Sequence, residues 1–107
     1  MDYGAIKRLN NEMDTKAVIG DRISVWLEAV DKTAADICRS LDLEPNAFSQ
    51  WRNGVHRLPL EVADDLCRIY RLTLDWIYRG DLASLPDEEL RRKINEITKR
   101  RRRFIAS

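Results

Sequence analysis

The segment from Thr33 to Gly54 constrains the fold of this chain more than any other stretch. The spacing of its apolar residues predicts two short helices that cross steeply over a shared core. Those residues are Ile37, Cys38, Leu41, Leu43, Phe48 and Trp51. Thr33 is a favourable N-cap with Asp36 three residues further on, and Pro45 suits the first position of the second helix. The Asn53-Gly54 pair ends that helix, because glycine readily adopts a left-handed backbone.

The second of these helices leaves one polar face outside the predicted core. Its residues are Asn46, Ala47, Ser49, Gln50 and Asn53. A short polar helix that its neighbour holds outward is suited to insertion into the major groove of DNA. The spacing therefore points to recognition of a nucleic acid as well as to a fold.

Helical spacing also runs through the rest of the chain, and no segment has the period of a strand. Further helices are predicted over residues 19–31, from Leu58-Pro59 to Tyr70, over 74–79 between Thr73 and Gly80, and from Asp87 onward. The stripe of the first contains Ile19, Ile23, Trp26, Leu27 and Val30, and that of the second Leu60, Ala63, Leu66, Cys67 and Tyr70. We expect an all-α protein with an N-terminal segment (1–18), a helical domain (19–81), and a linker with a basic C-terminal helix (82–107).

Charge is unevenly divided along the 107 residues, although the net charge is only +1. Residues 19–80 carry 8 basic against 10 acidic side chains, and residues 81–107 carry 8 against 5. An acidic helical domain is not the simplest expectation for a DNA-binding protein, because phosphate contacts supply much of the affinity. The distribution of the charges matters more than their sum, so the DNA interpretation is weakened without being removed.

Composition excludes several other classes. No apolar run is long enough to span a bilayer and no secretory signal opens the chain, so we expect a cytoplasmic protein without membrane contact. Cys38, Cys67 and His56 form no zinc pattern, and both thiols are expected to be reduced core residues. Because the chain has neither a nucleophile–base pair nor a phosphate-binding glycine loop, we expect no enzyme activity, metal or cofactor.

Three separated motifs resemble the lambda-repressor-like helix-turn-helix family (Cro/cI type, also called the XRE family) over residues 19–81. They are IGDRI in the first helix, LDLEPNAFSQWRNG across the two short helices, and LTLDWIYRGD at the end of the domain. The resemblance implies five packed helices, a cytoplasmic dimer of bacterial or phage origin associated with the nucleoid, and repression of transcription at operator DNA.

The resemblance also implies site residues. The third helix would read bases through Pro45, Asn46, Ala47, Ser49 and Gln50. Phosphates would be contacted by Thr33, Arg52, Asn53, His56 and Arg57; Arg52 enters this set as our own hypothesis. Gln50 is the leading base reader, because its amide can hold adenine through two hydrogen bonds. Asn46 has the same chemistry but could equally cap its own helix.

The chain departs from the family pattern at several positions. Ala34 replaces a Gln that contacts phosphate, Asp42 replaces the turn glycine, and Glu44 puts a carboxylate near the expected path of the DNA. Leu27 and Arg52 together replace an Arg–Glu pair between the first and third helices. Our hypothesis is that Arg52 turns to solvent or phosphate and partly compensates for Ala34 and Glu44.

Two features of the tail remain open from sequence. The basic run Lys99–Arg103 is either an arm that binds phosphate or a solvated helix end. The stripe of Leu90, Ile94 and Ile97 either pairs two subunits or folds back on the first and fifth helices. The alternative function is therefore an antitoxin-like or adaptor protein that binds a protein partner through its C-terminal helix.

Overall fold

The computed structural model describes residues 14–106, with side chains described to residue 102. This part of the chain is all-helical, as predicted, and contains no strand. Its elements are α2 (Lys16–Val30), α3 (Ala34–Leu41), α4 (Pro45–Arg52), α5 (Leu60–Tyr70), α6 (Leu74–Arg79), the short 3-10 helix η1 (Leu82–Ser84) and α7 (Glu88–Ala106). Residues 1–13 of the predicted N-terminal segment lie outside the described residues.

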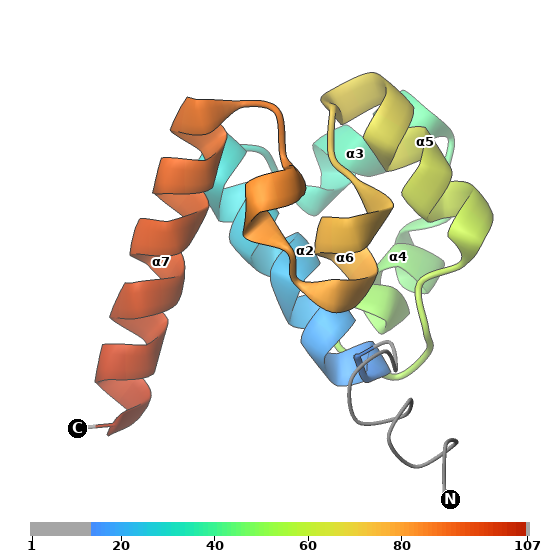
Figure 1. Cartoon of the computed structure of the whole chain (residues 1–107). Coiled ribbons are helices and arrows are strands. Elements are labelled where there is room, and N and C mark those ends of the chain that lie inside the picture. The colour runs from blue at the N-terminus through green and yellow to red at the C-terminus, as the bar shows by residue number, and fades with distance from the viewer. Residues whose placement is uncertain (1–13, 107) are drawn as a thin grey trace, which may run out of the picture.

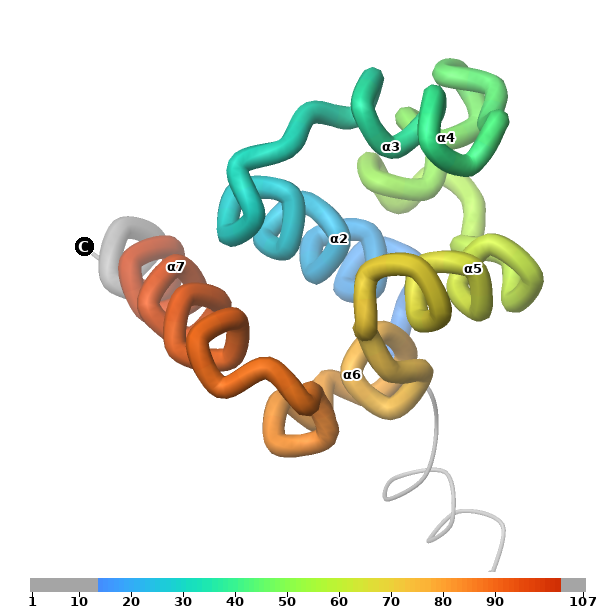
Figure 2. Tube along the Cα trace, turned by 90° about the horizontal axis from the view of Figure 1, so that it is seen from above, coloured from blue at the N-terminus to red at the C-terminus, as the bar shows by residue number. Residues whose placement is uncertain are grey.

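Helix α2 is the central element of the fold. It contacts α4, α6 and α7, and in both Figure 1 and Figure 2 it lies between α7 and the α3–α4 pair. Its predicted stripe is buried except for Val30, which is half-buried, and Val25 and Ala29 on another face are buried as well. A helix with buried residues on several faces needs neighbours on more than one side. This explains why α7 covers a face of α2 that α4 leaves free.

The helix ends follow local sequence signals. Thr15 caps α2, so the helix begins three residues before the predicted Ile19. Thr33 and Asp36 form the predicted capping box at α3, while Thr73 caps α6 and Gly80 ends it in the left-handed conformation. Caps depend on neighbours within one turn, and for that reason sequence alone locates them well.

One residue of the predicted core is exposed, and several others, among them Leu41, Cys67 and Tyr70, are half-buried at its edge. Leu60, predicted on the apolar stripe of α5, has an exposed fraction of 59%. Trp51 is half-buried, whereas Trp26 and Trp76 are buried. Leu60 is the first residue of α5, and the buried face of the helix begins only with Ala63 and continues with Leu66.

The C-terminal stripe folds back rather than remaining free. Leu90, Ile94 and Ile97 are buried, and α7 packs along α2. The predicted linker contributes as well, because Leu85 is buried and the Thr73 and Ser84 hydroxyls hydrogen-bond at 2.5 Å. The helical tail and the preceding helices therefore share one core.

Both cysteines, Cys38 and Cys67, are free thiols in the structure. Burial raises the pKa of each above its ordinary value. In residues 14–106 no helix has both the length and the apolar character that crossing a membrane requires.

Candidate nucleic-acid interface

Helices α3 and α4 are joined by a turn of three residues. Asp42 adopts a left-handed conformation (φ 53°, ψ 51°), and its N–H donates to the carbonyl of Cys38. The N–H of Leu43 donates to the same carbonyl at 2.9 Å. Asp42 thus adopts the left-handed conformation that glycine takes most readily, and the turn directs the chain into α4.

Two aromatic side chains of helix α4 anchor this helix to the core. The side chain of Phe48, a residue of α4, has an exposed fraction of 0% and lies on the core side of the helix. Its ring meets that of Trp51 edge to face, with centroids 6.2 Å apart and an interplanar angle of 82°. This arrangement, which aromatic pairs favour, holds one face of α4 to the core and leaves the opposite face to solvent.

Gly20 on α2 sets how closely α4 approaches. An ideal Cβ at Gly20 would lie 2.5 Å from the carbonyl oxygen of Arg52 and closer still to that of Trp51. Only a residue without a Cβ allows this backbone contact between α2 and the end of α4. The sequence motif IGDRI includes this glycine, but the reason for it becomes clear only when the two helices are seen together.

The five predicted surface residues of α4 and its C-cap differ in how far they are exposed. Asn46, Ser49 and Asn53 are exposed, while Ala47 and Gln50 are half-buried. Asn53 Nδ2 donates to Ser49 Oγ at 3.3 Å. Within residues 14–102 the Gln50 amide makes no hydrogen bond, so its donor and acceptor are available to a ligand.

The N-terminus of α4 is already occupied by an internal anion. The Glu44 carboxylate accepts from the N–H groups of Asn46 (3.1 Å) and Ala47 (2.9 Å). These N–H groups form the positive end of the helix dipole, a position that favours anions such as phosphate. Glu44 therefore stabilises α4 and competes with phosphate for the same donors.

A similar competition exists at the start of α3. The Thr33 N–H donates to Asp36 Oδ2 at 2.9 Å, and Thr33 Oγ1 accepts from the Asp36 N–H at 3.2 Å. The bond from the Thr33 backbone is the main reason why the pKa of Asp36 falls below its ordinary value. Thr33, predicted as a phosphate contact, thus has its backbone donor engaged within the helix cap.

The two arginines predicted to contact phosphate have intramolecular partners. Arg52 is half-buried and its Nε donates to Ser24 Oγ on α2 at 3.3 Å, so its side chain turns only partly to solvent, and its contact with phosphate stays a prediction. Arg57 is exposed, and its Nη1 donates to the carbonyl of Asp14 at 3.0 Å. Ser24, the hydrogen-bond partner of Arg52, was not among the predicted site residues. It could not be found from sequence, because the two residues lie in different helices and no local pattern connects them.

His56, predicted as a phosphate contact, is exposed in the loop after α4. Its N–H and that of Val55 donate to the carbonyl of Gln50, at 3.3 Å and 2.9 Å. The loop that carries His56 and Arg57 is consequently tied to the end of α4. Among the described residues no group of three His, Cys, Asp or Glu side chains could hold a metal ion.

Comparison of the chain with models of protein families, with curated proteins and with solved structures finds no match. The geometry of α3, α4 and their neighbours is therefore the basis for any functional assignment.

Proposed function

We propose that the chain is a sequence-specific DNA-binding transcriptional regulator with a lambda-repressor-like helix-turn-helix domain. In this role it acts in the cytoplasm as a dimeric repressor, inserts α4 into the major groove of operator DNA, and needs neither catalysis nor a cofactor. The observation that carries the proposal is the polar face of α4. The buried side chain of Phe48 anchors the opposite face of this helix in the core, and the short turn from α3 fixes where the helix begins.

The roles within this proposal follow from the geometry. Gln50 reads a base, because its amide is half-exposed and makes no hydrogen bond among the described residues. Asn46, Ser49 and Ala47 contribute to the same surface. Phosphates meet the flanks of this face, at the exposed residues Thr33, Asn53, His56 and Arg57 and at the half-buried Arg52. Because Glu44 and Asp36 occupy helix N-termini, affinity depends on these few cationic and polar groups.

Selection of binding sites from random duplex DNA tests the proposal. A palindromic consensus with half-sites about 10 base pairs apart is expected for a dimer. Gln50→Ala should lower the affinity for the consensus by about 5- to 150-fold, which corresponds to about 1–3 kcal/mol. Asn95→Ala, which removes an exposed amide from α7, is the matched control and should leave the affinity unchanged. Absence of enrichment over non-specific binding would overturn the proposal.

Arg52 gives a second test of the same interface. Arg52→Ala should weaken DNA binding and flatten its dependence on salt, because one phosphate contact releases about one counterion. Because Arg52 Nε donates a hydrogen bond to Ser24 Oγ, the variant Ser24→Ala alters the position of the Arg52 side chain without removing its charge. It therefore separates the effect of positioning from that of charge. An unchanged salt slope for Arg52→Ala would remove this residue from the interface.

The alternative, an antitoxin-like or adaptor protein, gains support from a different surface. Leu60 and Leu74 have exposed fractions of 59% and 39% and line a hollow of about 610 Å³ between α5 and α6. The stripe on α7, which first suggested a protein partner, is covered by α2. Co-purification distinguishes the functions, since a stoichiometric partner without retention on DNA at moderate salt favours the alternative.

A further inference from the structure

Two large apolar side chains are exposed in the hollow between the start of α5 and α6. Leu60, the first residue of α5, has an exposed fraction of 59%, and Leu74, the first residue of α6, has one of 39%. Both line the hollow of about 610 Å³, together with the half-buried Pro59. Covering such side chains with another apolar surface removes them from water, which is favourable. The hollow therefore offers accessible apolar surface for an occupant.

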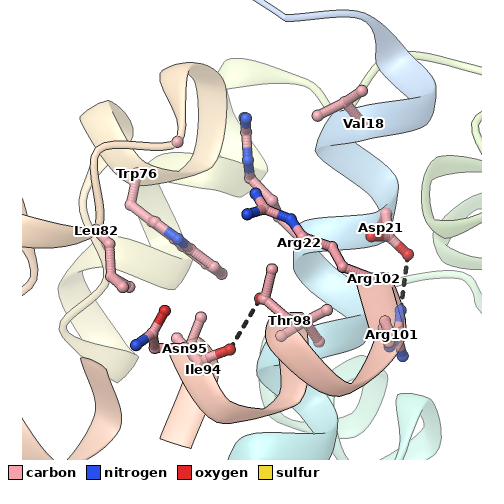
Figure 3. Close-up of a pocket in the computed structure, with 12 residues that line it drawn as sticks. Val18, Asp21, Arg22, Trp76, Leu82, Ile94, Asn95, Thr98, Arg101 and Arg102 are labelled. Carbon is pink, nitrogen blue, oxygen red and sulfur yellow. Dashed lines mark hydrogen bonds and ion pairs between the residues drawn. The ribbon is translucent and has the colours of Figure 1, made fainter. Parts of the chain in front are cut away.

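The cavity between α2, α6 and α7 is different in kind. Figure 3 shows side chains from these three helices around it, among them Trp76 and Ile94, each with an exposed fraction of only 3%. Arg101, at the same cavity, pairs with Asp21 at 2.7 Å, as the dashed line in the figure marks. These groups already have partners within the chain. In the hollow between α5 and α6, by contrast, the described residues leave the apolar side chains uncovered.

The described structure begins at Asp14, which is fixed to the wall of the same hollow. The Asp14 N–H donates to the carbonyl of Tyr78 at 3.0 Å, and the Asp14 carbonyl accepts from Arg57 Nη1 at 3.0 Å. Tyr78 and Arg57 both line the hollow. The Asp14 carboxylate also pairs with Arg22 of α2. Residues 1–13 are consequently attached to the molecule at the wall of this hollow.

The segment that ends at this attachment carries apolar side chains of its own. They are Tyr3, Ile6, Leu9 and Met13. Leu9 is five residues before Asp14, and an extended chain of that length spans up to about 17 Å. A short tether also keeps its side chains at an effective concentration on the order of millimolar. The segment is thus long enough to reach the exposed leucines, and weak apolar contacts suffice to hold it there.

We propose that residues 1–13 of the same chain dock in this hollow, with Ile6 and Leu9 packed against Leu60 and Leu74. The covalent attachment favours this occupant, because a second copy or a foreign protein must find the same surface from solution. A protein partner that used these two leucines would have to displace the segment first. None of the residues proposed to read bases lines the hollow, so the inference does not depend on the proposed function.

Photo-crosslinking of the full chain tests which occupant the hollow takes. Leu60 is replaced by p-benzoylphenylalanine, and the cross-linked peptides are mapped by mass spectrometry after proteolysis. We expect a cross-link from this position to residues 1–13 within one chain. Ile69 is the matched control, because it has an exposed fraction of 53% on the same helix but does not line the hollow. The same replacement there should give no such cross-link.

Two double variants of the segment separate docking from mere proximity. Ile6→Ser with Leu9→Ser should lower the yield of the cross-link about fivefold or more, because the apolar contact is lost. Asn10→Ser with Asn11→Ser removes no apolar surface and should leave the yield unchanged. Circular dichroism verifies that the variants are folded.

Four results would overturn the proposal. They are equal yields in the two double variants, equal cross-linking from the Leu60 and Ile69 positions, no cross-link from the Leu60 position, and a cross-link between two chains whose yield rises with protein concentration. The last of these would identify a second copy as the occupant.

Discussion

Gly20 is the residue on which the position of α4 depends most directly. Replacing it with alanine would place a Cβ against the backbone of α4, so one of the two helices must move. We expect Gly20→Ala to lower the free energy of unfolding by about 1–3 kcal/mol, as overpacking does. Urea unfolding followed by circular dichroism measures the change.

Helix propensity alone gives the opposite sign for this substitution, since alanine is favoured over glycine by about 1 kcal/mol within a helix. A stabilised Gly20→Ala variant would therefore show that α2 and α4 are not in backbone contact. Lys16→Ala, at an exposed position of the same helix, is the control and should change stability little.

Asp42 holds the turn before α4 in a conformation that costs a residue with a Cβ about 1–2 kcal/mol. Asp42→Gly removes this strain but adds entropy to the unfolded chain, so we expect a net stabilisation of up to about 1 kcal/mol. Ser40→Gly, within α3, should instead destabilise by about 0.5–1 kcal/mol. Chemical denaturation of both variants checks the contrast, and destabilisation by Asp42→Gly would contradict it.

The capping box gives the stability a dependence on pH. Folding lowers the pKa of Asp36, so its contribution is present above the ordinary pKa of the carboxyl and is lost as the pH falls through the folded value. Asp36→Asn should therefore be less stable than the parent chain at neutral pH, and the difference should shrink in acid. Denaturant midpoints across the acid range measure this, and a difference independent of pH would exclude the carboxylate as its source.

At the scale of elements, α7 is held to α2 by two kinds of contact of unequal strength. Ile94 is buried, with an exposed fraction of 3%, whereas the ion pairs of Arg100 and Arg101 with Asp21 and Glu28 lie at the surface. Ile94→Ala should cost about 2–5 kcal/mol. Arg101→Gln should cost less than about 1 kcal/mol, and that loss should disappear at high salt.

Hydrogen exchange along α7 measures where these losses act. Faster exchange confined to α7 in Ile94→Ala would indicate that the helix detaches as a unit, and faster exchange throughout the chain would indicate one cooperative core. Protection unaffected by the substitution would contradict the packing of the stripe on α2.

The helices themselves were well predicted from the sequence, but the neighbours against which each helix packs were not. Pro45, Thr73 and Gly80 mark helix ends through interactions within a turn, so α4 and α6 could be located from sequence. The stripe of Leu90, Ile94 and Ile97 identified a helix with a buried face. The sequence left open whether a second subunit or the helices of the same chain cover that face. An apolar stripe specifies burial without specifying the surface that buries it.

At the scale of the whole molecule, the basic tail lies away from the proposed DNA surface. Helix α7 and the α3–α4 pair are on opposite sides of α2, and acidic side chains of α2 already pair with Arg100 and Arg101 (Figure 2). We expect Arg100→Gln to leave the salt slope of DNA binding unchanged, and Arg57→Gln to reduce it by about one. Filter-binding or anisotropy measurements over a range of salt decide between them, and an equal reduction in both would place the tail on the DNA.

The sequence by itself determined the helices, the caps at Thr33 and Thr73, the turn at Asp42 and the polar face of α4, because each depends on residues within a few positions of one another. The tertiary structure alone decided that Gly20 admits the end of α4, that Arg52 reaches Ser24, and that α7 covers α2. Contacts of this kind join residues far apart in the chain, and their geometry follows from how the helices pack rather than from any local pattern.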